Sequence, residues 1–323
     1  MMKLWGMSFC FLLMVSLTWA MKTPPWVNLN VQVVDEQGKA IESAQAGVGY
    51  PSRISGKGDL FKKLTDEEGR TSFSGSSFFK FRVKAEKAGY YDSYEEVTTF
   101  ERVDKENVYS DQSVTLVLRE VRNPMPMYAY KEIKAKLPVL GKAVGFDMMK
   151  ADWVSPYGQG EVADILLEVA GEWNGYRDHD SLLTLHFQNK GDGYNLFKAN
   201  GQSRLSSPYK APLSDYVSNK SWRKMKRPIE GAISEWDSVD DVLPDANYIL
   251  RVRTVLDEDD EVKQANYGKM YGDFKFWGAT LDKYGYAVFS YYLNPTPNDR
   301  NLEFDPKRNL FKNLSAMERV TEP

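Results

Sequence analysis

Only two histidines are available for acid–base or metal chemistry in this chain of 323 residues. His179 lies between Asp178 and Asp180, and His186 follows seven residues later. Imidazoles beside carboxylates can hold a metal or exchange protons. However, the H-E-x-x-H spacing of zinc proteases and the G-x-S-x-G elbow of serine hydrolases are both absent. Because a polar turn and a sheet face account for the two histidines, the sequence indicates no catalytic residue.

A run of acidic residues at 257–261 directly follows a predicted strand. Alternate carboxylates in such a loop, here those of Asp257, Asp259 and Glu261, can bind Ca²⁺, a hard cation that prefers oxygen ligands. The run lacks the glycine and the distant glutamate of an EF-hand loop. A solvated hairpin tip is therefore the alternative interpretation, and the sequence indicates no other cofactor.

Aromatic residues crowd the second half of the chain, several of them beside Gly, Asn or Asp. Flat rings next to polar groups suit stacking against sugars, and they equally suit the core of a β-sandwich. The Asn174-Gly175 pair predicts a turn, which favours exposure of its aromatic neighbours. We expect a ligand-binding surface from these residues: Trp173, Asn174, Tyr176, Trp222 and Trp277.

Residues 220–227 form a short basic segment with one tryptophan. Such a segment suits either a solvated surface loop or contact with an anionic glycan. The formal net charge of the chain is −3, which gives no long-range attraction to nucleic acid. The expected partner is a carbohydrate or another envelope component, and nucleic acid is not expected.

The first twenty residues have the composition of a secretory signal. Lys3 precedes an apolar stretch at 4–17, and Thr18 and Ala20 are small residues at the positions that signal peptidase reads. The stretch is shorter than the ~20 apolar residues that a spanning helix needs. Cleavage near Ala20 would remove Cys10, the only cysteine. We expect a secreted or periplasmic bacterial protein with no transmembrane segment in the mature chain.

Residues 26–122 carry short alternating segments separated by turn signals. Val27, Leu29, Val31 and Val33 alternate with polar residues, which is typical of a half-buried strand. Several such strands at regular spacing predict an antiparallel, immunoglobulin-like β-sandwich.

The motifs in this region resemble the carboxypeptidase-regulatory-like domain, a family related to transthyretin-like modules. The matching residues are Asp35 and Gly38, Ala40-Ile41, Ala44, Thr65-Asp66 and Gly69, and Lys87-Ala88-Gly89-Tyr90. Ala40 stands where the family usually has proline. The resemblance covers residues 27–121 and implies a seven-stranded sandwich acting as a spacer, stabilising partner or adhesive unit. It implies a fold and leaves activity open.

The prolines Pro124 and Pro126 predict a stiff linker at 123–130, because they hold the backbone extended. Beyond it, residues 131–318 are rich in segments of strand type, such as 165–169 and 286–293. We expect an all-β chain in which a second, larger antiparallel sandwich or jelly-roll-like domain follows the first. The second region resembles no family that we can name.

These observations favour an exported bacterial binding protein that recognises a polysaccharide or envelope component without catalysis. A secreted glycan-active hydrolase is one alternative, since it needs only two carboxylates about 5–10 Å apart. It predicts a concave pocket lined by at least two carboxylates and an aromatic ring. A structural envelope protein with no small ligand is the other alternative, and it predicts a convex surface.

Overall fold

A computed structural model describes residues 26–50, 59–76, 80–103, 106–231, 235–243, 245–277 and 285–323. The expected signal peptide lies outside these residues. Within them the chain is all-β, as predicted: the regular elements are strands, apart from the single 3-10 turn η1 (Pro306–Arg308). No described helix is long and apolar enough to cross a membrane.

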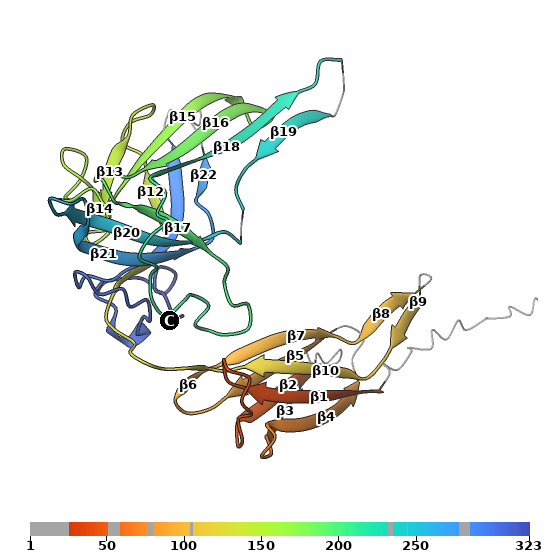
Figure 1. Ribbon diagram of the computed structural model, residues 1–323. Coiled ribbons are helices and arrows are strands. Elements are labelled where there is room, and N and C mark those ends of the chain that lie inside the picture. Colours follow the sequence, from red (N-terminus) through yellow and green to blue (C-terminus); the bar gives the residue numbers. More distant parts are fainter. Residues whose placement is uncertain are drawn as a thin grey trace, which may run out of the picture.

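The first sandwich pairs a three-stranded sheet with a four-stranded sheet (Figure 1). The three-stranded sheet has the order β10 (Gln112–Val117), β1 (Trp26–Val34), β4 (Arg70–Ser76). The four-stranded sheet has the order β3 (Asp59–Leu64), β2 (Gln45–Tyr50), β5 (Lys80–Glu86), β7 (Ser93–Thr98). β1 and β10 run parallel, although the sequence suggested an antiparallel arrangement throughout. Two short pairs complete the domain: β6 (Tyr90–Tyr91) with β11 (Arg119–Glu120), and β8 (Phe100–Val103) with β9 (Glu106–Tyr109).

The Thr65-Asp66 motif and Gly69 together hold the turn before β4. The hydroxyl of Thr65 donates to the carbonyl of Ile41 at 2.7 Å and accepts from the backbone N–H of Ala44 at 2.9 Å. Gly69 has φ +71°, and a Cβ there would lie 2.4 Å from the carbonyl oxygen of Val33. Only glycine fits both conditions, so the motif fixes where β1, β2 and β4 meet.

The second sandwich consists of two six-stranded antiparallel sheets. The first has the order β12 (Tyr128–Lys136), β23 (Tyr286–Leu293), β21 (Val262–Tyr271), β20 (Asn247–Leu256), β17 (Gly193–Phe197), and β22 (Lys275–Trp277) pairs with β23. The second has the order β14 (Asp152–Trp153), β13 (Val144–Asp147), β15 (Ile165–Gly175), β16 (Asp178–His186), β18 (Asn219–Pro228), β19 (Trp236–Asp240). Since β12 begins at Tyr128, the second domain starts inside the expected linker.

Arg253 ties the two sheets of this sandwich together through buried carboxylates. Its guanidinium contacts Asp164 at 2.7 Å and 3.0 Å and Asp147 at 2.9 Å. Burial raises the pKa of Asp164 against the pull of the guanidinium. Burial also disfavours the Asp147 carboxylate, but the N–H groups of Glu161 and Val162, aided by Arg253, hold its pKa below the ordinary value. The cluster thus anchors the loop between β13 and β15 to strand β20.

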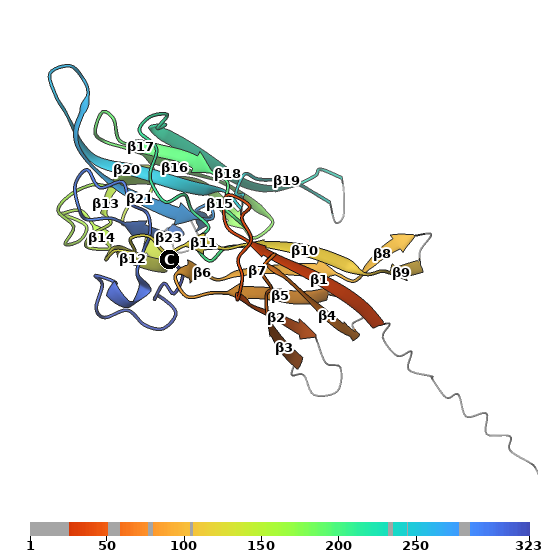
Figure 2. The same cartoon turned by 60° about the horizontal axis from the view of Figure 1, so that its bottom comes forward.

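The two sandwiches meet at the end of the first domain that carries β6, as both views show (Figure 1, Figure 2). The joint is formed largely by the loop at 199–209, which leaves β17 and reaches the first domain. Backbone hydrogen bonds link this loop to the first domain. The N–H of Tyr94 donates to the carbonyl of Gln202, and the N–H of Arg204 donates to the carbonyl of Asp92. The buried Lys269 holds the same loop from behind, donating to the Ser207 hydroxyl at 3.0 Å.

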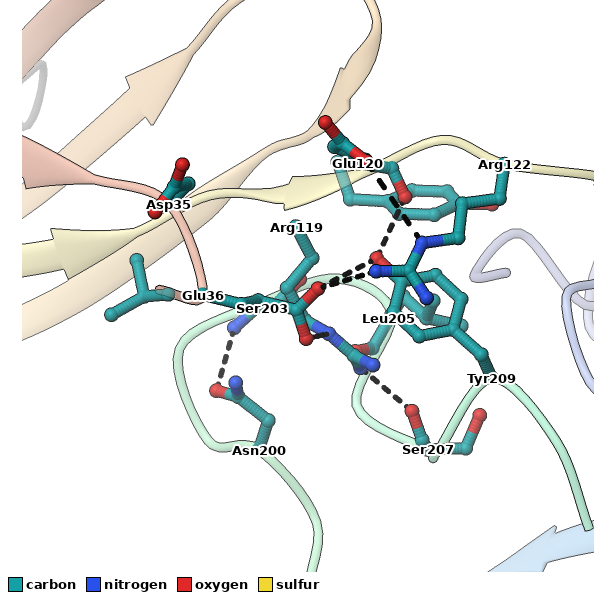
Figure 3. Close-up of polar contacts among 12 residues, drawn as sticks. Asp35, Glu36, Arg119, Glu120, Arg122, Asn200, Ser203, Leu205, Ser207 and Tyr209 are labelled. Carbon is teal, nitrogen blue, oxygen red and sulfur yellow. Dashed lines mark hydrogen bonds and ion pairs between the residues drawn. The ribbon is translucent and has the colours of Figure 1, made fainter. Parts of the chain in front are cut away.

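Arg119 is the central side chain of this joint (Figure 3). The residue is 5% exposed, and its guanidinium donates to Glu36 at 2.9 Å and to the carbonyls of Leu205 and Ser207. It also lies 4.3 Å from the ring centre of Tyr209. Because one cation satisfies acceptors from both domains, the first sandwich is docked on the second and is not tethered by a free linker.

Candidate functional site

A pocket of about 740 Å³ opens on the outer face of the sheet that contains β12, β23 and β20. We call it the sheet pocket. Three carboxylates line it, those of Glu132, Asp245 and Asp273, together with the lysines Lys198 and Lys275. Val242, Val288, Phe289 and Tyr271 supply apolar and aromatic lining. Convergent polar groups over an apolar wall are typical of a ligand site.

A β-bulge turns Glu132 toward the sheet pocket. The register of β12 against β23 shifts between Tyr130 and Ile133, and Glu132 has φ +48°. Its backbone N–H donates to the hydroxyl of Ser290 at 2.9 Å, and its carboxylate meets Lys275 at 2.9 Å. The hydrogen bond from Lys275 holds the pKa of Glu132 below its ordinary value. Glu132 is therefore a carboxylate at neutral pH, suited to accept hydrogen bonds.

Asp273 reaches the pocket because the chain turns sharply between β21 and β22. Gly272 makes the turn with φ +76°. The Asp273 side chain is 6% exposed and accepts from the N–H of Leu243 at 2.8 Å and from the hydroxyl of Tyr248. Burial, followed by the hydrogen bond to Asp273, raises the pKa of Tyr248. Asp273 is thus a fixed acceptor in the pocket wall.

The sheet pocket continues toward the joint between the domains. A second pocket, of about 500 Å³, shares Ala199 and Gly201 with it. The first domain contributes Lys84, Asp92 and Tyr94 to this second pocket. The two cavities therefore lie next to the same loop residues, and the second one includes residues of both sandwiches.

The five residues predicted to bind a ligand do not form one surface. Trp222 is fully buried and packs on Phe274 with ring centres 5.2 Å apart, so it belongs to the core. Trp277 is 49% exposed and lies on the same outward face of β22 as Lys275, near the sheet pocket. Its place there brings an exposed ring to the side of the sheet that holds the carboxylates.

Trp173, Asn174 and Tyr176 lie together at the turn between β15 and β16, as the Asn-Gly signal suggested. Tyr176 is 75% exposed, and Trp173 stacks on His179 with ring centres 4.9 Å apart. The amide of Asn174 donates to Asp178 at 3.1 Å. This cluster lies at the far end of the other sheet and is separate from the sheet pocket.

The acidic run forms the tip of the β20–β21 hairpin. Asp257 accepts from the N–H groups of Asp259 and Glu261 at 3.0 Å and 2.9 Å, and Asp260 pairs with Lys190 at 2.6 Å. In the described part of the chain, no group of three or more His, Cys, Asp or Glu residues is arranged to hold a metal ion. The carboxylate of Asp257 therefore serves the turn, and the geometry adds no support for Ca²⁺.

The sequence did not indicate Glu132, Asp273 or Lys275 as site residues. They come from different strands, and each is an ordinary charged residue in its own segment. The bulge at Glu132 and the turn at Gly272 bring them together, and only Gly272 leaves a visible trace in the sequence.

Comparison with known proteins identifies no family. No family model and no curated protein matches the chain. A 3-chlorocatechol 1,2-dioxygenase from Rhodococcus opacus 1CP is 13% identical over 32% of this chain and 62% of its own, with TM-score 0.26. A Streptococcal ancillary pilin is 10% identical over 70% of this chain and 52% of its own, with TM-score 0.22. A candidate carbohydrate binding protein from Bacteroides uniformis ATCC 8492 is 12% identical over 82% of this chain and 97% of its own, with TM-score 0.20.

The chain spans less than two thirds of both the dioxygenase and the ancillary pilin. Whole-chain similarities with such low TM-scores leave the function to be argued from the residues of this chain alone.

Proposed function

We propose that this is an exported bacterial protein that binds a polysaccharide through the sheet pocket. The observation that carries the proposal is the meeting of fixed carboxylates, an amide and apolar rings in one open cavity. Sugar hydroxyls donate to carboxylates such as Glu132 and Asp273 and exchange hydrogen bonds with the amide of Asn247. The exposed ring of Trp277 suits stacking on a sugar face at the rim.

Two neighbouring cavities support a polymer as the ligand. The second pocket shares Ala199 and Gly201 with the sheet pocket, and Tyr94 adds a half-exposed ring to it. We propose that the first sandwich is a carboxypeptidase-regulatory-like module whose docked position completes the second pocket with Lys84, Asp92 and Tyr94. Its sheets of three and four strands are compatible with the seven strands of that family.

A hydrolase is the second candidate, because the pocket has the carboxylates and aromatic ring that this alternative predicts. A glycosidase also needs a general acid, a carboxyl group whose pKa is raised so that it holds a proton. The pKa of Glu132 is lowered by Lys275, which is the opposite requirement. Asp273 already accepts two hydrogen bonds from the protein. These partners favour binding over bond cleavage.

The test is a glycan array of bacterial and plant polysaccharides probed with the full chain and with three variants. Trp277→Ala removes an exposed ring on the face of β22 that carries Lys275, Asp245→Ala removes an exposed carboxylate of the pocket lining, and we expect each to weaken binding about tenfold. Tyr157→Ala is the matched control, since its ring is equally exposed but follows β14, a strand of the other sheet. Failure to bind any polysaccharide contradicts the proposal, and release of shorter sugars from a bound glycan favours the hydrolase.

A further inference from the structure

The second sandwich has an open end that its opposing sheet does not cover. β18 and β19 run beyond the rest of the domain (Figure 1). Side chains alternate along a strand, so the face that buries Trp222 in the core also carries Lys224 and Lys226. On β16, Leu183 and His179 likewise share one face, and His179 is the direct ladder partner of Lys226. We call this continuation of the core-facing side the distal face.

Two cations on the distal face share one aromatic ring. The guanidinium of Arg177 lies 4.9 Å from the ring centre of Trp236, and the ammonium of Lys226 lies 5.0 Å from the same ring. Lys226 is also 4.9 Å from the ring of Tyr176. Cation–π contacts hold each charged group within about 5 Å of the same ring centre and restrict its motion. The rings therefore preorganise a pair of positive charges.

This pair has no counter-ion within the described part of the chain. The neighbouring cations do: Arg223 and Arg227 both contact Asp180, at 2.6 Å and 3.2 Å, and Lys224 is 3.7 Å from Asp240. Among the residues that the structure describes, no salt bridge involves Arg177 or Lys226. Two like charges near one ring repel each other, and an anionic ligand that contacts both offsets that repulsion and adds charge-assisted hydrogen bonds.

We propose that the distal face binds the acidic groups of a polysaccharide. Arg177 and Lys226 receive a carboxylate or sulfate, and the 75% exposed ring of Tyr176 offers its free side to the sugar that carries the acid. Duplex nucleic acid fits poorly, because its phosphates follow at one charge per about 1.7 Å and demand many more cations than two. This site is independent of the sheet pocket.

The test uses polygalacturonate, a regular acidic polysaccharide, with the full-length chain at about 50 mM and about 500 mM NaCl. The double variant Arg177→Gln/Lys226→Gln is expected to lose at least about tenfold in affinity at low salt. The control is Lys131→Gln/Lys263→Gln, which changes net charge equally at two exposed lysines, and it should stay within about twofold. Equal affinity of the two double variants overturns the proposal.

Two further measurements separate the sugar from the charge and this site from the other. Tyr176→Ala should weaken polygalacturonate binding more than it weakens binding of inorganic polyphosphate, since it removes the ring that stacks on the sugar as well as one cation–π contact of Lys226. Equal or tighter binding of polyphosphate or duplex DNA by the unaltered protein contradicts a polysaccharide ligand. The Trp277→Ala variant should bind polygalacturonate normally, so a failure of the sheet pocket and a failure of the distal face give different results.

Discussion

Cations occupy two contrasting environments in this protein. Arg253 and Arg119 are largely buried, and each meets protein acceptors on several sides. Arg177 and Lys226 lie on aromatic rings at an open sheet end and form no salt bridge among the described residues. The difference separates two uses of positive charge. A buried cation with all its partners holds segments together, whereas a preorganised cation without a partner is available to a ligand.

The groups left behind when each cation is removed differ as well. Asp164 is fully buried beside Arg253, and Asp147 is 2% exposed. Removing the guanidinium would leave both carboxylates without their cation in a medium that solvates charge poorly. At the distal face, removing the Lys226 ammonium leaves no buried carboxylate unpaired, because its neighbours there are the rings of Tyr176 and Trp236. Stability should therefore respond strongly to the first group and weakly to the second.

The largest expected effect is that of Arg253→Met. This change keeps much of the side-chain volume but leaves two buried carboxylates without their cation. Removing one partner of a buried ion pair lowers the free energy of unfolding by about 3–5 kcal/mol. Urea unfolding at neutral pH should show a lower midpoint with an unchanged slope. Lys263→Met, at an exposed position of the adjacent strand, is the control and should change stability little. A loss below about 1 kcal/mol for Arg253→Met would remove the proposed contrast.

The joint should give the next largest effect. Arg119→Met removes the donor that contacts Glu36, Leu205 and Ser207, and we expect a loss of about 2–3 kcal/mol, because hydrogen bonds to charged groups are worth more than neutral ones. Calorimetry should then resolve two unfolding transitions in place of one as the domains uncouple. The control is Arg122→Ala, whose guanidinium is half-exposed and 3.5 Å from Glu36. A single transition in the Arg119 variant would show that other contacts carry the docking.

Much of the fold could be predicted from local pattern, since alternation at Val27 to Val33 and the turn at Gly69 specify strands and their ends. The parallel pairing of β1 with β10 could not, because alternation tells which face of a strand is buried and leaves its neighbour open. Trp222 illustrates the limit within the site. Its basic neighbours predicted a surface loop, but the segment is a strand. Lys220 and Lys224 share the face of Trp222, and their apolar stems can pack beside its buried ring while their charged ends reach solvent.

The residues of the sheet pocket were out of reach for a related reason. Glu132 depends on a bulge whose position no residue type announces, and Asp273 depends on how β21 turns into β22. Their proximity is set by the order of strands in the sheet, which arises from contacts between distant segments. In contrast, Trp173, Asn174 and Tyr176 are close because they share one turn, and a local signal sufficed to group them.

Glycines on β15 give a smaller and sharper test of how closely β15 approaches its neighbour β16. Gly171 and Gly175 have similar φ values, +144° and +151°. A Cβ at Gly171 would lie 2.1 Å from the carbonyl oxygen of Asp180, whereas a Cβ at Gly175 would have no heavy atom within 4 Å. Alanine strains the backbone at both positions, so the difference between the variants isolates the clash. We expect Gly171→Ala to unfold about 1–3 kcal/mol more easily than Gly175→Ala.

The smallest expected effect on stability is that of Lys226→Met. Its ammonium forms two exposed cation–π contacts, each worth about 0.5–1 kcal/mol, and the methionine side chain regains part of that through contact with the same rings. Urea unfolding should therefore change by less than about 1 kcal/mol, while binding of polygalacturonate falls. If Lys226→Met instead destabilises the protein as much as Arg119→Met, the ring-bound cations hold the sheet together. Lys226 would then have a structural role, and the distinction between structural and ligand-binding cations would not hold.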